Sequence, residues 1–250
     1  NDNCIWSWHI WVTAYDPAAS AQTYTGGAVF MDRNLGAASI TDPGLYYQWG
    51  RKEPFGASYT RMIYHEDYPY DITDPMMGYG EMTLAYSIAH PWTFMCGVAM
   101  NDDRYDDAPD WLSPQNNLWG NASSATALAD AGSKSIYDPC PPGWRVPDRR
   151  TFAEAAISKN TGGLSDACYS MRINTSGMCA NYSRGGYLMD GTQYNPDKAA
   201  LVWTNAPAQY QTGVNYYKHY STALKIYPAA VEPLARISRD MALPVRCVRE

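Results

Sequence analysis

The stretch Ser135-Ile-Tyr-Asp-Pro-Cys-Pro-Pro-Gly-Trp-Arg-Val-Pro147 combines prolines and a glycine with a few large apolar side chains. Proline lacks a backbone N–H and has a fixed φ angle, so this stretch cannot continue a helix or a central strand. It predicts an ordered loop that turns Trp144 and Val146 toward the core. The loop carries no reactive side-chain pattern, and we interpret it as scaffold.

A helix is expected directly after this loop, over residues 148–158. Asp148 is a good N-cap residue, and Phe152, Ala156 and Ile157 recur at helical spacing. The helix therefore presents one apolar face to the core.

Other aromatic-rich motifs accompany this loop along the chain. They are Trp6-Ser-Trp-His-Ile-Trp11, Met31-Asp-Arg-Asn-Leu-Gly36, Gly44-Leu-Tyr-Tyr-Gln-Trp-Gly-Arg-Lys52, Leu118-Trp-Gly120, Val202-Trp-Thr204 and Leu243-Pro-Val-Arg-Cys-Val-Arg-Glu250. In this order the motifs resemble the major paralogous domain family of surface proteins in Fibrobacter and the Bacteroidales. The matches extend over nearly the whole chain.

The resemblance implies an α+β, C-type lectin-like domain with short, twisted antiparallel sheets, few helices and long ordered loops. Proteins of this kind are distantly similar in fold to formylglycine-generating enzymes and to the variable proteins of diversity-generating retroelements. Those relatives divide between catalysis and ligand binding, so the fold alone does not decide the function. The resemblance also implies an extracellular or bacterial cell-surface location, as an outer-membrane lipoprotein or part of a fimbria.

The composition is that of one folded domain over residues 1–250, with insertion-like loops at about residues 53–115. Apolar residues make up 46% of the chain and charged residues 18%, which is enough to build a substantial core. The net charge is −6, and no run of lysine or arginine is present, which argues against nucleic acid as a partner. No apolar run approaches the ~20 residues of a membrane span, and no signal peptide opens the sequence, as expected for a mature or trimmed domain.

The strand pattern is clearest at the two ends of the chain. Residues 5–14 and 27–32 are expected to pair as a hairpin, and the aromatic residues 44–50 to line the core. A short helix is expected at residues 123–131, and turns with short strands at 181–195. The last strands are predicted at residues 202–204, 223–227 and 244–248.

The six cysteines form no Cys-x-x-Cys pair and have no histidine at metal-ligand spacing, so disulfides are favoured over zinc. Cys140 and Cys247 lie in the family-like motifs and are expected to pair. Cys168 and Cys179 are the next candidate pair, which leaves Cys4 and Cys96 to pair or stay free. The paired reactive cysteines of formylglycine-generating enzymes have no counterpart here, and we expect no enzyme activity.

Carboxylates provide the weaker alternatives. Residues 101–110 cluster acidic side chains, for which a solvated loop is favoured over a calcium site. No cofactor is therefore expected, and calcium is the one left open. Asp32 and Glu53 could form a glycosidase pair, although Asp32 beside Arg33 is more simply a structural ion pair.

Composition gives the best indication of function. The chain has 21 tyrosines against four phenylalanines, and binding surfaces favour tyrosine for its large contact area at small entropic cost. The densest run is residues 205–222, where an ordinary surface loop and a ligand site are equally compatible with the sequence. The residues predicted to bind a glycan or protein ligand are Asn205, Tyr210, Asn215, Tyr216, Tyr217, His219 and Tyr220.

These observations favour a surface binding or adhesion domain, with other fimbrial subunits as further partners. The resemblance supports this choice, because in retroelement-diversified relatives the variable residues lie in this C-terminal part of the fold. Two alternatives are a surface enzyme acting on glycans and a purely structural pilus subunit.

Overall fold

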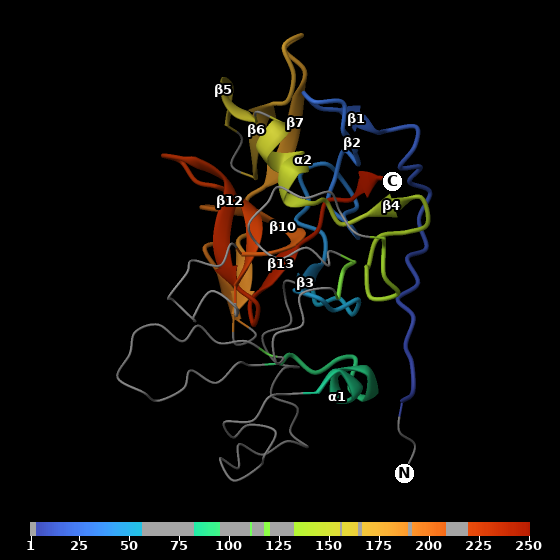
Figure 1. Ribbon diagram of the computed structural model, residues 1–250. Helices are drawn as coiled ribbons and strands as arrows, with labels where there is room; N and C mark the ends of the chain where they lie inside the picture. Colours follow the sequence, from blue (N-terminus) through green and yellow to red (C-terminus); the bar gives the residue numbers. More distant parts are fainter. Residues whose placement is uncertain are drawn as a thin grey trace, which may run out of the picture.

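Short antiparallel strands dominate the computed structural model, which describes residues 4–56, 83–95, 111, 118–120, 133–155, 157–164, 167–189, 192–208 and 220–250 (Figure 1). The helices of this part are α1 (Leu84–Ala89) and α2 (Arg149–Glu154). The strands are β1 (Gln22–Thr23), β2 (Val29–Phe30), β3 (Tyr46–Gln48), β4 (Trp144–Arg145), β5 (Ser158–Leu164), β6 (Cys168–Arg172), β7 (Cys179–Ser183), β8 (Tyr187–Met189), β9 (Thr192–Tyr194), β10 (Ala200–Pro207), β11 (Tyr220–Ile226), β12 (Val231–Ser238), β13 (Ala242–Pro244) and β14 (Val248–Arg249).

The strands form four small sheets, ordered β1-β2-β14-β4, β10-β11-β12, β3-β13-β8-β9 and β5-β6-β7. All described pairings are antiparallel. The expectation of short antiparallel sheets with few helices is thus confirmed in the described part of the chain.

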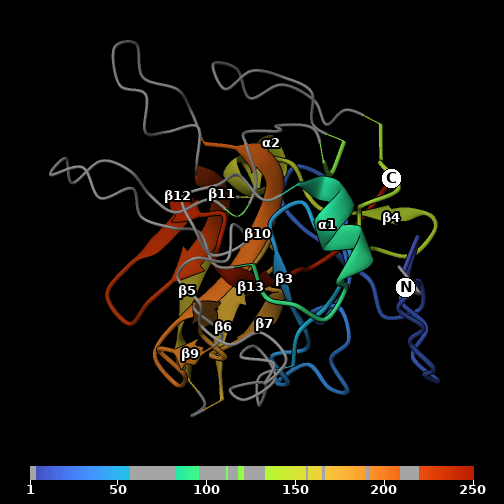
Figure 2. The same cartoon turned by 90° about the horizontal axis from the view of Figure 1, so that it is seen from below.

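Strand β10 is buried on both faces, since each of its eight residues is buried. Side chains alternate across a strand, so Leu201 and Trp203 pack into one core cluster while Ala200 and Val202 pack into another. Helix α2 contacts all three strands of the β10-β11-β12 sheet, and β13 lies beside β10 (Figure 2). A continuous apolar run in the sequence of β10 is the expected consequence of this two-sided burial.

Buried tryptophans fix the segment that contains β3. Each indole N–H donates a hydrogen bond to a main-chain carbonyl, which satisfies the one polar group of an otherwise apolar ring. The donor and acceptor pairs are Trp203 to Tyr47 at 2.8 Å, Trp111 to Trp49 at 2.9 Å, Trp119 to Arg51 at 3.3 Å and Trp49 to Thr204 at 3.0 Å.

Two buried polar side chains, Gln48 and Arg51, join the same segment to residues 90–95. The Gln48 amide donates to the Met95 carbonyl at 2.7 Å and accepts from the Met95 N–H at 2.9 Å. The Arg51 guanidinium donates to the Thr93 carbonyl at 2.7 Å and lies 3.6 Å from the Glu53 carboxylate. Burial lowers the pKa of Arg51 to about 10, so the guanidinium stays charged at neutral pH.

Helix α2 begins as predicted but ends early. The Asp148 carboxylate accepts from the Thr151 N–H at 2.8 Å, which confirms it as the N-cap. The helix ends at Glu154 rather than Ser158, because Ser158 already pairs with Arg172 as the first residue of β5. Pairing with the next strand, β6, has overridden the local helical pattern.

Residues 5–14 belong to no sheet, so the predicted hairpin between this segment and residues 27–32 is wrong. Strand β2 pairs instead with β1, through a tight turn at Gly26 and Gly27, both with φ of +87°. Only glycine adopts such angles readily. The turn brings the nearer residues 22–23 against β2, and the N-terminal segment remains outside.

Cys140 and Cys247 form a disulfide, as the motifs implied, with 5.9 Å between their Cα atoms. The pairing expected for Cys168 and Cys179 is wrong. They lie at opposite ends of the β6–β7 ladder, where Cys168 faces Ser183 and Cys179 faces Arg172. That separation is about 13 Å along the strands, beyond the ~7 Å that a disulfide spans. Cys4 keeps its thiol, and Cys96 lies outside the described residues.

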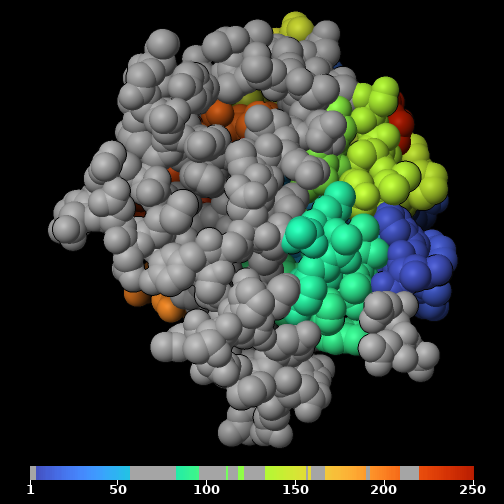
Figure 3. Space-filling model, turned by 60° about the horizontal axis from the view of Figure 1, so that its bottom comes forward, coloured from blue at the N-terminus to red at the C-terminus, as the bar shows by residue number. Residues whose placement is uncertain are grey.

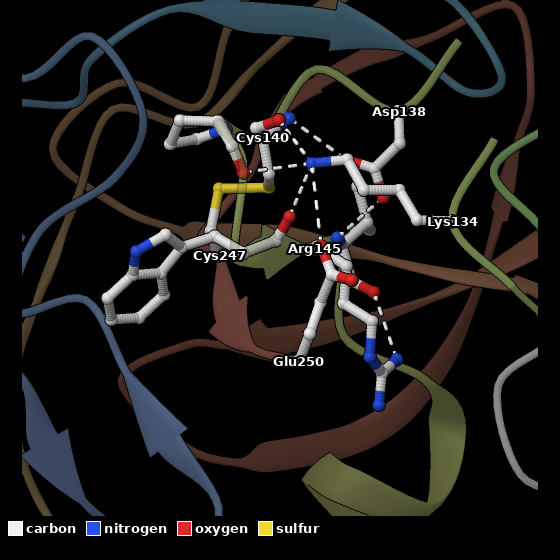
Figure 4. Close-up of a disulfide and its surroundings, with 9 residues drawn as sticks. Lys134, Asp138, Cys140, Arg145, Cys247 and Glu250 are labelled. Atoms are coloured by element: carbon white, nitrogen blue, oxygen red, sulfur yellow. Dashed lines mark hydrogen bonds and ion pairs between the residues drawn. A yellow bond between two sulfur atoms is a disulfide. The ribbon is translucent and has the colours of Figure 1, made fainter. Parts of the chain in front are cut away.

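Lys134 reinforces the disulfide region. Its ammonium group donates to the carbonyls of Cys140, Pro141 and Trp144, and it lies 3.9 Å from the Glu250 carboxylate (Figure 4). Three carbonyls and a carboxylate replace the water that the lysine loses. The proline-rich loop and the C-terminal strand are thus joined both covalently and by charge.

We expect replacement of both Cys140 and Cys247 by alanine to lower the free energy of unfolding by up to ~5 kcal/mol, because the bridge closes a long loop in the unfolded chain. Denaturant titration of the variant and the parent measures the change. Cys4→Ala is the matched control and is expected to shift the midpoint little. An unchanged midpoint for the double variant would contradict a structural role for the disulfide.

Trp203→Phe is expected to destabilise the fold by at least ~1 kcal/mol, since it leaves the buried Tyr47 carbonyl without its indole donor. The same substitution at Trp92, which is 57% exposed, is the control and should be near neutral. Thermal unfolding of the two variants compares them directly. Equal melting temperatures would show that the indole bond is dispensable.

Candidate functional site

The tyrosine- and asparagine-rich run predicted to bind ligand connects β10 to β11. Most of its predicted ligand residues lie outside the described part of the chain: Tyr210, Asn215, Tyr216, Tyr217 and His219. Asn205 is 1% exposed within β10, so its prediction as a surface ligand residue is wrong. The strand continues to Pro207 and carries Asn205 into the interior. Tyr220 is half-buried as the first residue of β11 and faces Ser238.

The base of this connection is closed by strand pairing. Pro207 faces Ser221 across the β10–β11 ladder, and the Ala208 N–H donates to the Tyr220 carbonyl at 3.0 Å. Residues 209–219 therefore leave the sheet and return to it at neighbouring points. The chain on either side of residues 209–219 is thus held in the β10–β11 ladder.

A layer of buried hydroxyl groups supports the same end of the sheet. The Thr204 hydroxyl donates to the Thr222 carbonyl at 3.0 Å and lies 2.5 Å from the Thr222 hydroxyl. The Arg239 guanidinium donates to the Ser221 hydroxyl at 3.0 Å and lies 4.5 Å from the centre of the Trp49 ring. Hydrogen bonds of this kind fix the strand ends in one arrangement.

A pocket of about 380 Å³ lies where the N-terminal segment crosses the proline-rich loop, and we call it the Trp8 pocket. Figure 3 shows these two segments side by side, the N-terminal one in blue and the loop in yellow-green. The pocket is lined by Trp6, Ser7, Trp8, His9, Lys52, Ile136, Asp138 and Pro139. Trp8 is 78% exposed and Ile136 is 69% exposed, so the apolar walls face solvent.

Lys52 holds one wall of the Trp8 pocket in place. Its ammonium group donates to the Ser7 carbonyl at 2.8 Å, contacts the Glu53 carboxylate and lies 4.4 Å from the centre of the Trp6 ring. The Trp6–Trp11 motif predicted a strand and carried part of the family resemblance, but it did not predict this pocket. The signal that could have located a surface here is its run of tryptophan and isoleucine without a charged side chain.

Asp138 forms the buried floor of this pocket. Its carboxylate accepts from the Cys140 N–H at 2.8 Å and the Val146 N–H at 2.9 Å. Burial raises the pKa of Asp138 to about 6, in spite of these bonds and of the nearby Lys134 and Arg145. The carboxylate orders the loop and changes charge in mildly acidic solution.

A second pocket, of about 300 Å³, lies between the Gly26–Gly27 turn and helix α2. Its arginines and carboxylates form ion pairs with one another. Arg145 lies 3.0 Å from Asp148, and Arg150 lies 2.6 Å from Glu154. We interpret this pocket as a salt-bridged surface.

The two carboxylates considered for a glycosidase pair are each bound to cations. Asp32 pairs with Arg33 at 3.0 Å, which confirms the expected ion pair, and Glu53 pairs with Lys52 and Arg51. The acidic residues 101–110 lie outside the described part of the chain, within which no cluster of three or more His, Cys, Asp or Glu side chains could hold a metal ion. Neither described helix has the length and hydrophobicity that crossing a bilayer requires.

Asp138 predicts an unusual dependence of stability on pH. Its pKa of about 6 in the folded chain exceeds the ordinary 3.8, so the folded state binds the proton more tightly. The cost of burying the charge is present above pH 6 and disappears toward pH 4. The unfolding free energy of the parent minus that of Asp138→Asn should therefore increase by up to ~3 kcal/mol as the pH falls from about 7 to about 4.

Denaturant titrations across this pH range measure the difference. Asp197→Asn, which replaces an exposed carboxylate, is the matched control for the loss of one charge. A flat difference for Asp138→Asn would mean that this carboxylate is solvated in the folded chain.

Comparison with known proteins adds no relative to this picture: no family model, curated protein or solved structure matches the chain.

Proposed function

We propose that this chain is a ligand-binding domain of C-type lectin-like architecture. It acts at the bacterial cell surface, as a lipoprotein or in a fimbria-like assembly, and binds an extracellular glycan or protein. The observation that carries the proposal is the hydrogen-bonded base at Ala208 and Tyr220, from which residues 209–219 extend. Those residues read Gln-Tyr-Gln-Thr-Gly-Val-Asn-Tyr-Tyr-Lys-His, the composition of an adaptable binding loop.

The scaffold beneath this segment supports a role in recognition. A loop that becomes ordered on binding loses conformational entropy, which weakens its affinity. Fixed attachment points at both ends of the loop reduce this entropic cost. Here both attachment strands are largely buried. The Thr204 hydroxyl of β10 donates to the Thr222 carbonyl of β11, and the Arg239 guanidinium donates to the Ser221 hydroxyl of β11. The arrangement favours binding over a purely structural subunit, because such a subunit does not require a polar, tyrosine-rich segment on a fixed base.

The second alternative is a surface enzyme acting on glycans. It requires two carboxylates free to act as acid and base or nucleophile. In the described residues the two carboxylates first considered, Asp32 and Glu53, are each neutralised by neighbouring cations. The cation pairs therefore favour the binding proposal.

The test is a screen of the purified chain against arrays of glycans and extracellular-matrix proteins, with and without a calcium chelator. Single replacements of Tyr210, Tyr216 and Tyr217 by alanine should weaken binding by ~2 kcal/mol where the ring is an anchor. The same variants should keep their stability within about half a kcal/mol. Tyr194→Ala, at an exposed tyrosine of β9, is the matched control for both readouts.

Asn205→Ala provides an internal contrast, because its buried position predicts lost stability rather than lost contact with ligand. If the tyrosine variants unfold while the protein that remains folded keeps its affinity, residues 209–219 belong to the core and do not bind the ligand. A chain that binds nothing on either array favours the structural subunit, and hydrolysis of an arrayed glycan favours the enzyme.

A further inference from the structure

The ring of Trp8 forms an open wall of the Trp8 pocket and has no partner in the described part of the chain. It is 78% exposed. The neighbouring Trp6 ring is engaged, since the Lys52 ammonium lies 4.4 Å from its centre and the Tyr137 ring lies 5.9 Å away. Within the same described residues, Trp8 makes no ring or cation contact and its indole N–H donates no hydrogen bond. Its large apolar face is therefore available to a ligand.

Both walls of the pocket are held in place by contacts within the chain. The Ser7 hydroxyl donates to the Glu53 carboxylate at 3.0 Å and accepts from the Lys52 ammonium at 2.7 Å. These bonds fix the chain directly before Trp8. The opposite wall belongs to the proline-rich loop, which the Asp138 carboxylate holds through two backbone N–H groups. A preformed site binds without the full entropic cost of ordering its walls.

The pocket is amphipathic rather than purely apolar. Its volume of about 380 Å³ is typical of small-molecule sites, which combine apolar walls with a few polar groups. Burial lowers the pKa of His9, so its ring is neutral at pH 7 and offers one donor and one acceptor. A carboxylate can accept about four hydrogen bonds, and that of Asp138 accepts from the backbone N–H groups of Cys140 and Val146. The apolar walls are Trp8, Ile136 and Pro139.

A sugar ring matches these features better than a lipid or an organic cation. A pyranose with equatorial hydroxyl groups has a flat face of C–H bonds, which stacks on an indole. It also has an edge of hydroxyl groups, which pair with an imidazole or a carboxylate. A lipid would leave the polar groups of the pocket unpaired. A cation would lie close to Lys52, and the positive charges of Lys134 and Arg145 already act on Asp138.

We propose that the Trp8 pocket binds a β-linked hexopyranose of gluco or galacto configuration, stacked on the Trp8 ring with its hydroxyl groups toward His9 and Asp138. Aromatic stacking and hydrogen bonds supply its contacts, so binding requires no metal ion. The pocket is lined by the N-terminal segment, Lys52 and the proline-rich loop, which makes it a second site, separate from residues 209–219 (Figure 3).

The proposal is tested by NMR of the isotope-labelled full chain, whose nine tryptophans each give an indole N–H signal. Methyl β-D-glucopyranoside, methyl β-D-galactopyranoside, cellobiose and lactose are titrated into the millimolar range with a chelator present. One indole signal, identified by its loss in Trp8→Ala, should shift saturably with at least one of these sugars. Mannitol, an open-chain polyol without a flat face, should leave that signal unchanged.

Variants of the two walls test the site by saturation transfer to the protons of the sugar that binds. Trp8→Ala and Ile136→Ser should each weaken its affinity by about tenfold or more, and Trp8→Phe, which keeps a ring, should lose less. Trp92→Ala is the matched control, because Trp92 is 57% exposed and lies outside the pocket. Thermal unfolding checks that all variants fold, as the exposure of these side chains leads us to expect.

Three results would overturn the proposal. They are the absence of a saturable shift with any of the sugars, a shift produced by tetramethylammonium but by none of the sugars, and an affinity that Trp8→Ala leaves unchanged. Tyr216→Ala should not alter the titration, since it changes the segment between β10 and β11. A failure of the Trp8 pocket can therefore be told apart from a failure of the binding function proposed for residues 209–219.

Discussion

The hydrogen bonds between buried indole N–H groups and main-chain carbonyls hold this structure together. A tryptophan is the largest apolar side chain, but its N–H is costly to bury unpaired. Tyr47, Trp49 and Arg51 provide the carbonyls for three indoles, and Trp49 donates in turn to Thr204. One short segment thereby fixes rings from widely separated parts of the chain, and the direction of each bond sets how each ring lies in the core.

The two-sided burial of β10 follows from this arrangement. The tryptophan layer covers one face of the strand, while α2 and the aromatic cluster around Phe30 and Phe152 cover the other. A strand fixed on both faces is a firm base for the segment that follows it. The segment proposed to bind ligand is thus attached to a well-packed strand, as binding loops on rigid scaffolds commonly are.

Local sequence signals predicted the local features correctly. The prolines of residues 139–147 predicted the loop. Asp148 predicted the start of α2, because an N-cap depends only on residues about three positions apart, here Asp148 and Thr151. The core role of residues 44–50 followed from composition, and the Cys140–Cys247 pair from the motifs. For the candidate site, the sequence indicated the segment between β10 and β11, but it misassigned Asn205, since burial at a strand end depends on the packing of neighbouring sheets.

Features that depend on register were beyond the sequence. The end of α2 is set by the pairing of Ser158 with Arg172, and the separation of Cys168 from Cys179 is set by which residues of β6 and β7 face one another. The N-terminal segment has a strong strand pattern, but a pattern does not reveal whether an edge within the same chain is available. The pocket beside Trp8 arises from two segments more than a hundred residues apart, which no local pattern joins.

The bonds from Trp49 to Thr204 and from Trp203 to Tyr47 span 155 and 156 residues of sequence. The buried tryptophan layer therefore cannot form until the chain has been synthesised beyond residue 204. Contacts of such long range require closure of a large loop before any packing rewards it, and proteins rich in them fold slowly. During that interval the tryptophans are exposed to water and to other chains. The same interlocking that fixes the finished core thus delays its formation until the C-terminal strands have been made.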